Sequence, residues 1–156
     1  MMFTDKRQRD NGFTLVEILL VVAIIAILAA IVIFAVNPAR QLAQARNAQR
    51  SVDVNTILNA VYQHAIDSRG NVISEITTTQ KEICLTGTGT ASATCGALAD
   101  LEALTNSERY LVRIPEDPSE ATTTFGTGYY IRKSSNGRVT VVAGGAELST
   151  TISVTR

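Results

Sequence analysis

The chain has 156 residues with 14 basic and 14 acidic side chains, and therefore carries no formal net charge. This length accommodates one small domain beside any membrane segment. Because there is no basic excess to neutralise phosphates, the composition argues against a nucleic-acid partner.

Residues 18–36 form the most informative segment of the chain, because they contain only Ala, Val, Ile, Leu and Phe. As a helix this stretch would span about 28 Å, close to the ~30 Å of a bilayer's hydrocarbon core. A secretory signal peptide has a shorter apolar stretch, usually about 7–15 residues. The segment therefore predicts one transmembrane helix. The basic leader with Lys6, Arg7 and Arg9 predicts a cytoplasmic N-terminus and places the rest of the chain outside.

Glu17 stands at the head of this apolar segment. A carboxylate within hydrocarbon costs about 2.5 kcal/mol or more unless a cation pairs with it. Glu17 is therefore either solvated at the membrane surface or paired. A free amine on Phe13, created by cutting the chain after Gly12, would supply such a partner.

Residues 12–17 read Gly-Phe-Thr-Leu-Val-Glu, and with the apolar helix they resemble the processing motif of type IV prepilins and pseudopilins. The resemblance covers residues 1 to about 70. It implies cleavage between Gly12 and Phe13 by a prepilin peptidase, and N-methylation of Phe13. It also implies that Glu17 pairs with the Phe13 amine of a neighbouring copy. The implied partners are further copies of the chain, the peptidase, an assembly platform protein and a cytoplasmic ATPase.

Pro38 departs from that family pattern, because many members have a proline at the position of Phe34. Proline cannot donate a hydrogen bond to the carbonyl four residues earlier, and its ring crowds that turn. We therefore expect a helix kink at Pro38. The resemblance implies that such a weak point lets the helix stretch within a filament, which at Pro38 is a hypothesis.

Residues 37–69 predict an amphipathic continuation of the helix. Its apolar stripe has the expected spacing and comprises Val54, Ile57, Leu58, Val61 and Ala65, extended upstream by Leu42, Ala45, Ala48 and Val52. Gly70 is a suitable helix stop. Arg40, Arg46 and Arg50 are expected to form a solvated or inter-subunit face, and His64 a surface or edge position.

Residues 70–156 predict a β-rich outer domain. Strands are expected at 109–114, 129–133, 138–143 and 147–154, a short helix at 97–104 and a long loop at 115–128. Asn136-Gly137 predicts a hairpin with positive φ at both turn positions. The expected fold is α+β and pilin-like: a long N-terminal helix, transmembrane in its first half and amphipathic in its second, packed on a small antiparallel sheet.

Cys84 and Cys95 are the only cysteines. If the domain lies outside the membrane, its compartment favours oxidation, and we expect a disulfide between them. The loop that they enclose is rich in Thr, Gly, Ala and Ser, so that a covalent tether would stabilise it.

No hydrolase, metalloprotease, nucleotide or dinucleotide motif occurs in the sequence. We therefore expect neither catalytic residues nor a cofactor. Glu116, Asp117 and Glu120 are expected to be solvated loop carboxylates; a cation site there is the alternative, and no metal is predicted.

These observations divide the chain into a leader (1–12), a transmembrane and polymerisation helix (13–36), an amphipathic helix (37–69) and an outer domain (70–156). The resemblance implies a membrane precursor that becomes an extracellular or periplasmic filament subunit. The alternatives are a pseudopilin of a type II secretion system and a membrane-anchored binding module that does not polymerise.

Overall fold

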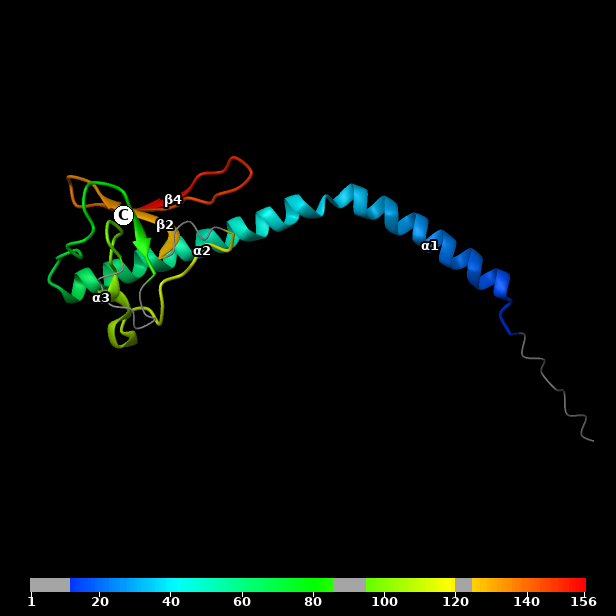
Figure 1. The fold of residues 1–156 in the computed structure, drawn as a ribbon, viewed down its shortest axis with the longest axis horizontal. Coiled ribbons are helices and arrows are strands. Elements are labelled where there is room, and N and C mark those ends of the chain that lie inside the picture. The colour runs from blue at the N-terminus through cyan, green and yellow to red at the C-terminus, as the bar shows by residue number, and fades with distance from the viewer. Residues whose placement is uncertain (1–11, 86–94, 120–124) are drawn as a thin grey trace, which may run out of the picture. The chain divides into compact units, whose positions relative to one another are not determined.

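The computed structural model describes residues 12–85, 95–119 and 125–156. The chain divides into two compact units, one up to Ala39 and the other Arg40–Arg156. The predicted fold class is confirmed: a long apolar helix is followed by a second helix and a four-stranded antiparallel sheet (Figure 1). The architecture is α+β and pilin-like.

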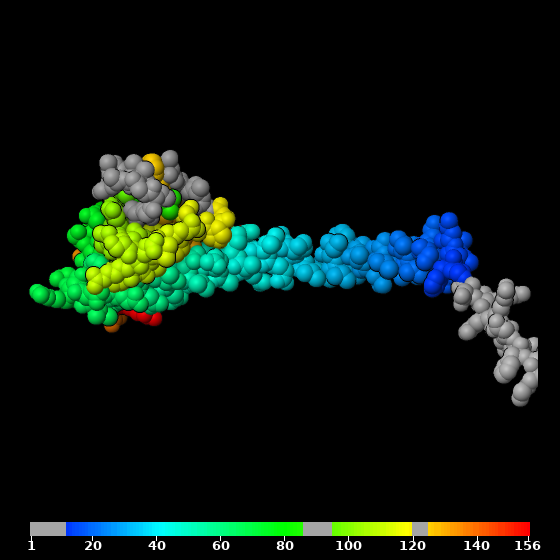
Figure 2. All heavy atoms as spheres, turned by 90° about the horizontal axis from the view of Figure 1, so that it is seen from below, coloured from blue at the N-terminus to red at the C-terminus, as the bar shows by residue number. Residues whose placement is uncertain are grey.

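Helix α1, Leu15–Val36, is the apolar segment, and none of its residues is buried (Figure 2). By length and composition it is the one helix in the described chain that is long and apolar enough to cross a membrane. It ends at Asn37, which adopts a left-handed conformation with φ 45°. Helix α2, Pro38–Asp67, begins with the proline. A proline is well tolerated there, because the first amide of a helix has no intrahelical acceptor.

Helix α2 ends where the sequence places a stop. Arg69 and Gly70 have positive φ, and the Gly70 amide donates to the Ala65 carbonyl over 2.7 Å. This closes the last turn with a glycine in the left-handed region, which only glycine adopts without steric cost.

The sheet has the order β1-β2-β3-β4, formed by Lys81–Cys84, Gly126–Lys133, Val139–Ala143 and Ile152–Thr155. The predicted strands at 129–133 and 138–143 lie in β2 and β3. The strand expected at 147–154 is shorter and begins only at Ile152. Strand β1 was not predicted. The short helix expected at 97–104 is α3, Glu102–Thr105, followed by the 3₁₀ turn η2, Asn106–Glu108.

The prediction of a strand at 109–114 is wrong, because these residues form no strand. The amides of Tyr110 and Leu111 both donate to the Leu104 carbonyl at the end of α3, so they are not available to a strand partner. The β2–β3 hairpin is present, but its turn differs from the prediction. Gly137 alone has positive φ (82°), and its amide donates to the Ser134 carbonyl over 3.0 Å.

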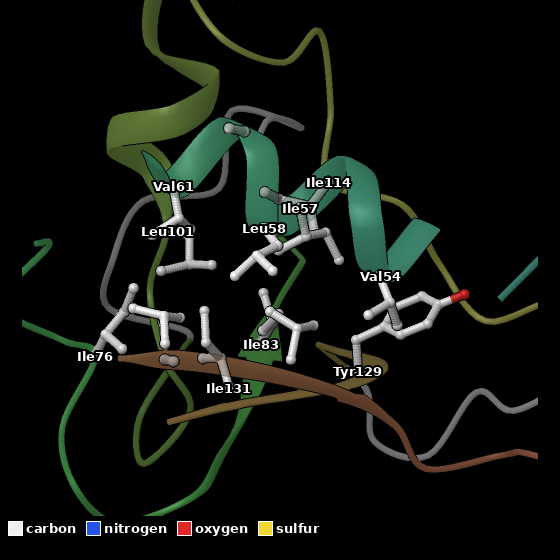
Figure 3. Packing of buried hydrophobic residues seen from close by; sticks show 14 of the residues in the cluster. Val54, Ile57, Leu58, Val61, Ile76, Ile83, Leu101, Ile114, Tyr129 and Ile131 are labelled. Carbon is white, nitrogen blue, oxygen red and sulfur yellow. The ribbon is translucent and has the colours of Figure 1, made fainter. Parts of the chain in front are cut away.

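The core lies between the second half of α2 and one face of the sheet (Figure 3). Val54, Ile57, Leu58 and Val61 point from the helix, and each is no more than 1% exposed. The opposing side chains include Ile76, Ile83, Leu101, Tyr129 and Ile131. The predicted stripe from Val54 to Ala65 is therefore the helix face that packs on the sheet.

The upstream part of the predicted stripe is wrong. Leu42 and Val52 are each 59% exposed, and Ala45 and Ala48 are exposed as well. The buried face continues instead through Arg50 to Ala43. The reason is that the domain covers the helix there with polar side chains, so that apolar periodicity no longer marks the buried face.

Candidate functional site

The segment with the predicted processing motif begins at Gly12, just before α1. Gly12 and Phe13 precede the helix and are exposed, and Thr14 has extended backbone (φ −78°, ψ 152°). A Cβ added to Gly12 would meet nothing within 4 Å, and its φ lies outside the left-handed region. This chain's own structure therefore does not require a glycine at position 12.

Thr14 caps helix α1. Its hydroxyl oxygen accepts a hydrogen bond from the Glu17 amide over 3.2 Å, which satisfies one of the free amides of the first turn. The pattern Ser/Thr-x-x-Glu, here Thr14 to Glu17, is the sequence signal from which this cap could have been predicted. The cap fixes the start of the helix after Phe13 and places the Glu17 side chain in its first turn.

Glu17 has an exposed carboxylate in that first turn. The positive end of the helix dipole favours a negative charge there. Within residues 12–85, 95–119 and 125–156, no cation lies within ion-pair distance of it. Among the residues that the structure describes, the charge of Glu17 therefore has no ion-pair partner.

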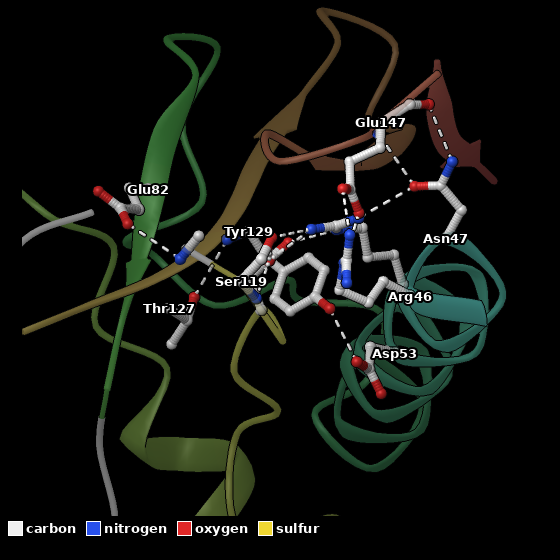
Figure 4. Close-up of polar contacts among 11 residues, drawn as sticks. Arg46, Asn47, Asp53, Glu82, Ser119, Thr127, Tyr129 and Glu147 are labelled. Atoms are coloured by element: carbon white, nitrogen blue, oxygen red, sulfur yellow. Dashed lines mark hydrogen bonds and ion pairs between the residues drawn. The ribbon is translucent and has the colours of Figure 1, made fainter. Parts of the chain in front are cut away.

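A second polar site lies on the first half of α2 and ties it to two loops (Figure 4). We call it the arginine cluster; its members are Arg46, Asn47, Arg50, Asp117, Ser119 and Glu147. Of the three arginines expected on a solvated or inter-subunit face, Arg40 is exposed, whereas Arg46 and Arg50 are turned towards the domain. Arg50 is fully buried, and Arg46 is one-third exposed.

Arg50 and Asp117 form the centre of the cluster. The guanidinium donates to both carboxylate oxygens of Asp117, over 2.7 and 2.8 Å, and also to the Ser119 hydroxyl. Both side chains of the pair are 0% exposed. Hydrogen bonding to Asp117 raises the pKa of Arg50 above its ordinary range, so the cation persists at every accessible pH.

Asp117 was expected to be a solvated loop carboxylate, and this prediction is wrong. Its neighbour Glu116 is exposed, and Glu120 lies outside the described residues. The difference has a cause in the fold: a buried arginine without a counter-charge would be costly, so the loop turns one carboxylate inward. Gly145 permits this packing, because a Cβ there would lie 2.9 Å from Asp117 Oδ2.

Glu147 is the second carboxylate of the cluster. Arg46 donates to it twice, over 2.7 and 2.6 Å, and Arg50 once, over 2.9 Å. Asn47 binds its backbone in both directions, over 2.9 and 3.0 Å. Hydrogen bonds from Arg46 and then Arg50 lower the pKa of Glu147 from 4.5 to about 2.

A further buried contact extends the cluster along α2. The Tyr129 hydroxyl donates to Asp53 Oδ2 over 2.7 Å, and Gln49 donates to Asp53 Oδ1 over 2.8 Å. Burial, and then the bond to Asp53, raises the pKa of Tyr129 well above its usual value. These contacts link sheet and helix, and the carboxylates are occupied by donors, so the site holds elements together.

The remaining predicted residues are placed as follows. Cys84 and Cys95 form the expected disulfide, with a Cα–Cα distance of 5.6 Å; residues 86–94 of its loop lie outside the described residues. His64 is partly buried and packs edge-on against Tyr110, with ring centroids 5.6 Å apart. In the described ranges no group of three or more His, Cys, Asp or Glu could hold a metal ion.

Comparison with known proteins gives one match. Residues 7–33 match the family described as "Prokaryotic N-terminal methylation motif". This range contains the Gly12–Phe13 junction, Glu17 and most of α1. No curated protein and no solved structure matches the chain.

Proposed function

We infer that this chain, which carries the leader signature of the type IV pilins and pseudopilins, is the precursor of a filament subunit. The proposed maturation cuts the chain between Gly12 and Phe13 and methylates the new amine. The mature chains then polymerise through α1. The function is assembly, and we propose no catalytic role.

The observation that carries this proposal is the exposed helix α1 together with its one carboxylate. Helix α1 has 22 residues, all of them apolar except Glu17, and none is buried, so its apolar surface can be covered only by lipid or by other chains. A simple anchor has no use for Glu17. The amine of Phe13 in a neighbouring copy would pair with it, and such a pair fixes register as well as proximity.

Gly12 supports the proposed cut. The chain's own structure does not require a glycine there, since a Cβ would have open space. We therefore propose that the glycine serves an enzyme, whose cleft must approach this backbone closely. The exposed, non-helical residues 12–13 are accessible to it.

The first experiment is the intact mass and N-terminal sequence of the protein purified from a host with its own prepilin peptidase. We expect a chain that begins at N-methyl-Phe13. A chain that still begins at Met1 or Met2 would contradict the proposal and favour a plain membrane anchor.

Glu17→Val separates a filament subunit from an anchor. The variant should insert into the membrane as well as the native chain, because a carboxylate has been removed from an apolar helix. It should assemble poorly, because the amine of its neighbour loses its partner. Glu75→Val is a matched control, since Glu75 is an exposed carboxylate in the other unit. Equal filament yield from both variants would favour the anchor.

The use of the filament is a separate question within the proposed class. We propose a surface pilus, with a secretion pseudopilus as the alternative. Filaments seen on the surface of expressing cells would support the pilus. Loss of protein secretion in a deletion strain without such filaments would support the pseudopilus.

A further inference from the structure

The outer edge of strand β1 is covered by a segment that lies outside the four-stranded sheet. In the order β1-β2-β3-β4, β1 is an edge strand, and β2 pairs with one side of it. Along the other side, the Ala99 amide donates to the Glu82 carbonyl over 2.8 Å, and the Cys84 amide donates to the Ala99 carbonyl over 2.9 Å. An open strand edge invites pairing with another extended chain, so proteins commonly cover it. Residues 95–99, which we call the edge cover, have this position on β1.

The edge cover is also joined to β1 covalently, at the same residue. Cys95 is the first residue of the cover and forms the disulfide with Cys84. Ala99 is its last residue and accepts the hydrogen bond from the Cys84 amide. A turn joins the two ends, since the Leu98 amide donates to the Cys95 carbonyl over 2.8 Å. The disulfide therefore does more than close the sequence between the two cysteines: it fastens the edge cover to β1.

Apart from the disulfide, the edge cover is held weakly. In the described ranges, the two hydrogen bonds through Ala99 are the only backbone hydrogen bonds that join it to the sheet. Gly96 and Ala97 are exposed, and Leu98 is only partly buried. The chain that follows is anchored differently, because Leu101 is 0% exposed and lies in the hydrophobic core (Figure 3). The cover can therefore open without removing the residues after it from the core.

We propose that the Cys84–Cys95 disulfide is a redox latch that closes the edge cover over β1. With two thiols in its place, the cover opens locally, while the helix–sheet core and the pairing of β2, β3 and β4 persist. Oxidation by a disulfide such as oxidised glutathione joins the two protein sulfurs, and the oxidant leaves as two thiols. In the closed state Cys84 is 1% and Cys95 5% exposed, so burial shields the bond from attacking thiols. The latch, once closed, stays closed.

The latch goes beyond the proposed function, because it concerns the second unit alone and does not depend on filament assembly. A chain that is still reduced has backbone groups on the β1 edge that are open to pairing with another extended chain. Oxidation removes this edge. If the domain lies outside the membrane, as proposed, its compartment closes the latch after export.

The test compares amide hydrogen exchange of the native full chain and of Cys84→Ala/Cys95→Ala, both in detergent micelles. The amides of residue 84 and Ala99 should exchange at least about tenfold faster in the variant, because local opening of the cover is no longer restrained by the cross-link. The Val139 amide, which donates to the Arg156 carbonyl over 2.8 Å, is the internal control and should change much less. Equal rates at Ala99 in the two chains would overturn the latch.

The reduced native chain gives a second measurement that keeps both cysteine side chains. Unfolding in denaturant with dithiothreitol converts the disulfide into two thiols while the reductant becomes a cyclic disulfide, and the chain is then refolded in the reductant. Exchange at Ala99 should be fast in this chain, and reoxidation with oxidised glutathione should make it slow again. Slow exchange at Ala99 in the reduced chain would contradict the proposal. If the variant and the reduced chain both lose the near-ultraviolet dichroism of the tyrosines, the disulfide supports the whole domain and a local latch is wrong.

Discussion

The Arg50–Asp117 pair decides how the first half of α2 is buried. Two ions that are both 0% exposed are stable only with each other and with further hydrogen bonds. The pair therefore adds specificity: it fixes which face of the helix meets the loops. Removing Asp117 takes from Arg50 its fully buried counter-charge and two hydrogen bonds, and leaves the ion pair with the partly exposed Glu147.

Asp117→Ala should lower the free energy of unfolding by about 3–5 kcal/mol, the cost of breaking a buried ion pair from one side. The measurement is chemical denaturation of the full chain in detergent micelles, followed by near-ultraviolet circular dichroism of the tyrosines. Glu116→Ala is the control, because Glu116 is exposed and its ion pair with Arg113 is 3.9 Å long. A similar change for both variants would show that the pair is not a principal restraint.

Glu147 makes the stability of the same domain depend on pH. Its pKa is about 2 in the folded chain against 4.5 ordinarily, so the folded state binds the proton more weakly than the unfolded state. Its contribution is therefore present above about pH 4.5 and is lost as the pH falls towards 2. In Glu147→Gln this dependence should be absent. The difference in unfolding free energy between native and variant chains should shrink from pH 7 to pH 2; a constant difference would contradict the assignment.

At the scale of elements, the spacing of apolar residues predicted the buried face of a helix correctly wherever that face is apolar. The stripe from Val54 to Ala65 was found because its burial is hydrophobic. Further upstream, the same face of the helix consists of Arg50 and its neighbours. Because these buried side chains are charged or polar, the sequence there shows no regular spacing of apolar residues. Strand β1 was missed for a similar reason, since Lys81 and Glu82 occupy half of its four residues while Glu82 is buried.

The N-terminal segment was predictable in more detail than the arginine cluster. The features of residues 12–38 are local: a junction, a cap, an apolar run and a proline. The cluster instead joins residues 67 to 101 positions apart, such as Arg50 with Asp117 and Arg46 with Glu147. Such pairings depend on how the loops fold back on the helix, and they cannot be predicted from the spacing of residues along one sequence.

Asn37, in the left-handed region, and Pro38 interrupt the regular helix between α1 and α2. Pro38→Ala restores an amide donor and removes a residue that costs about 3 kcal/mol in a helix interior. We expect helical hydrogen bonds to continue through residues 36–40, seen as slower amide hydrogen exchange there in detergent. Ala29→Leu is the control, since it changes no backbone donor. Unchanged exchange in Pro38→Ala would show that Asn37 alone interrupts the helix.

At the scale of the whole molecule, the two units have opposite relations to water. The first unit, up to Ala39, buries none of its described helix, whereas all of the hydrophobic core lies within Arg40–Arg156. The arginine cluster and the disulfide lie there too. The second unit therefore contains the hydrophobic core, the arginine cluster and the disulfide, whereas the apolar helix of the first unit is exposed along its whole length.

A chain that begins at Arg40 should consequently fold as a soluble protein without detergent and keep the near-ultraviolet dichroism of the full chain. A chain that begins at Ala48 is the matched control: it retains Arg50 but lacks Arg46 and Asn47, so Glu147 loses four of its five hydrogen bonds to α2. The control should unfold at a lower temperature, because the 147–150 turn is then held by Arg50 alone. If the chain from Arg40 aggregates while the full chain stays folded in detergent, the second unit depends on the first, and the two units are one cooperative structure.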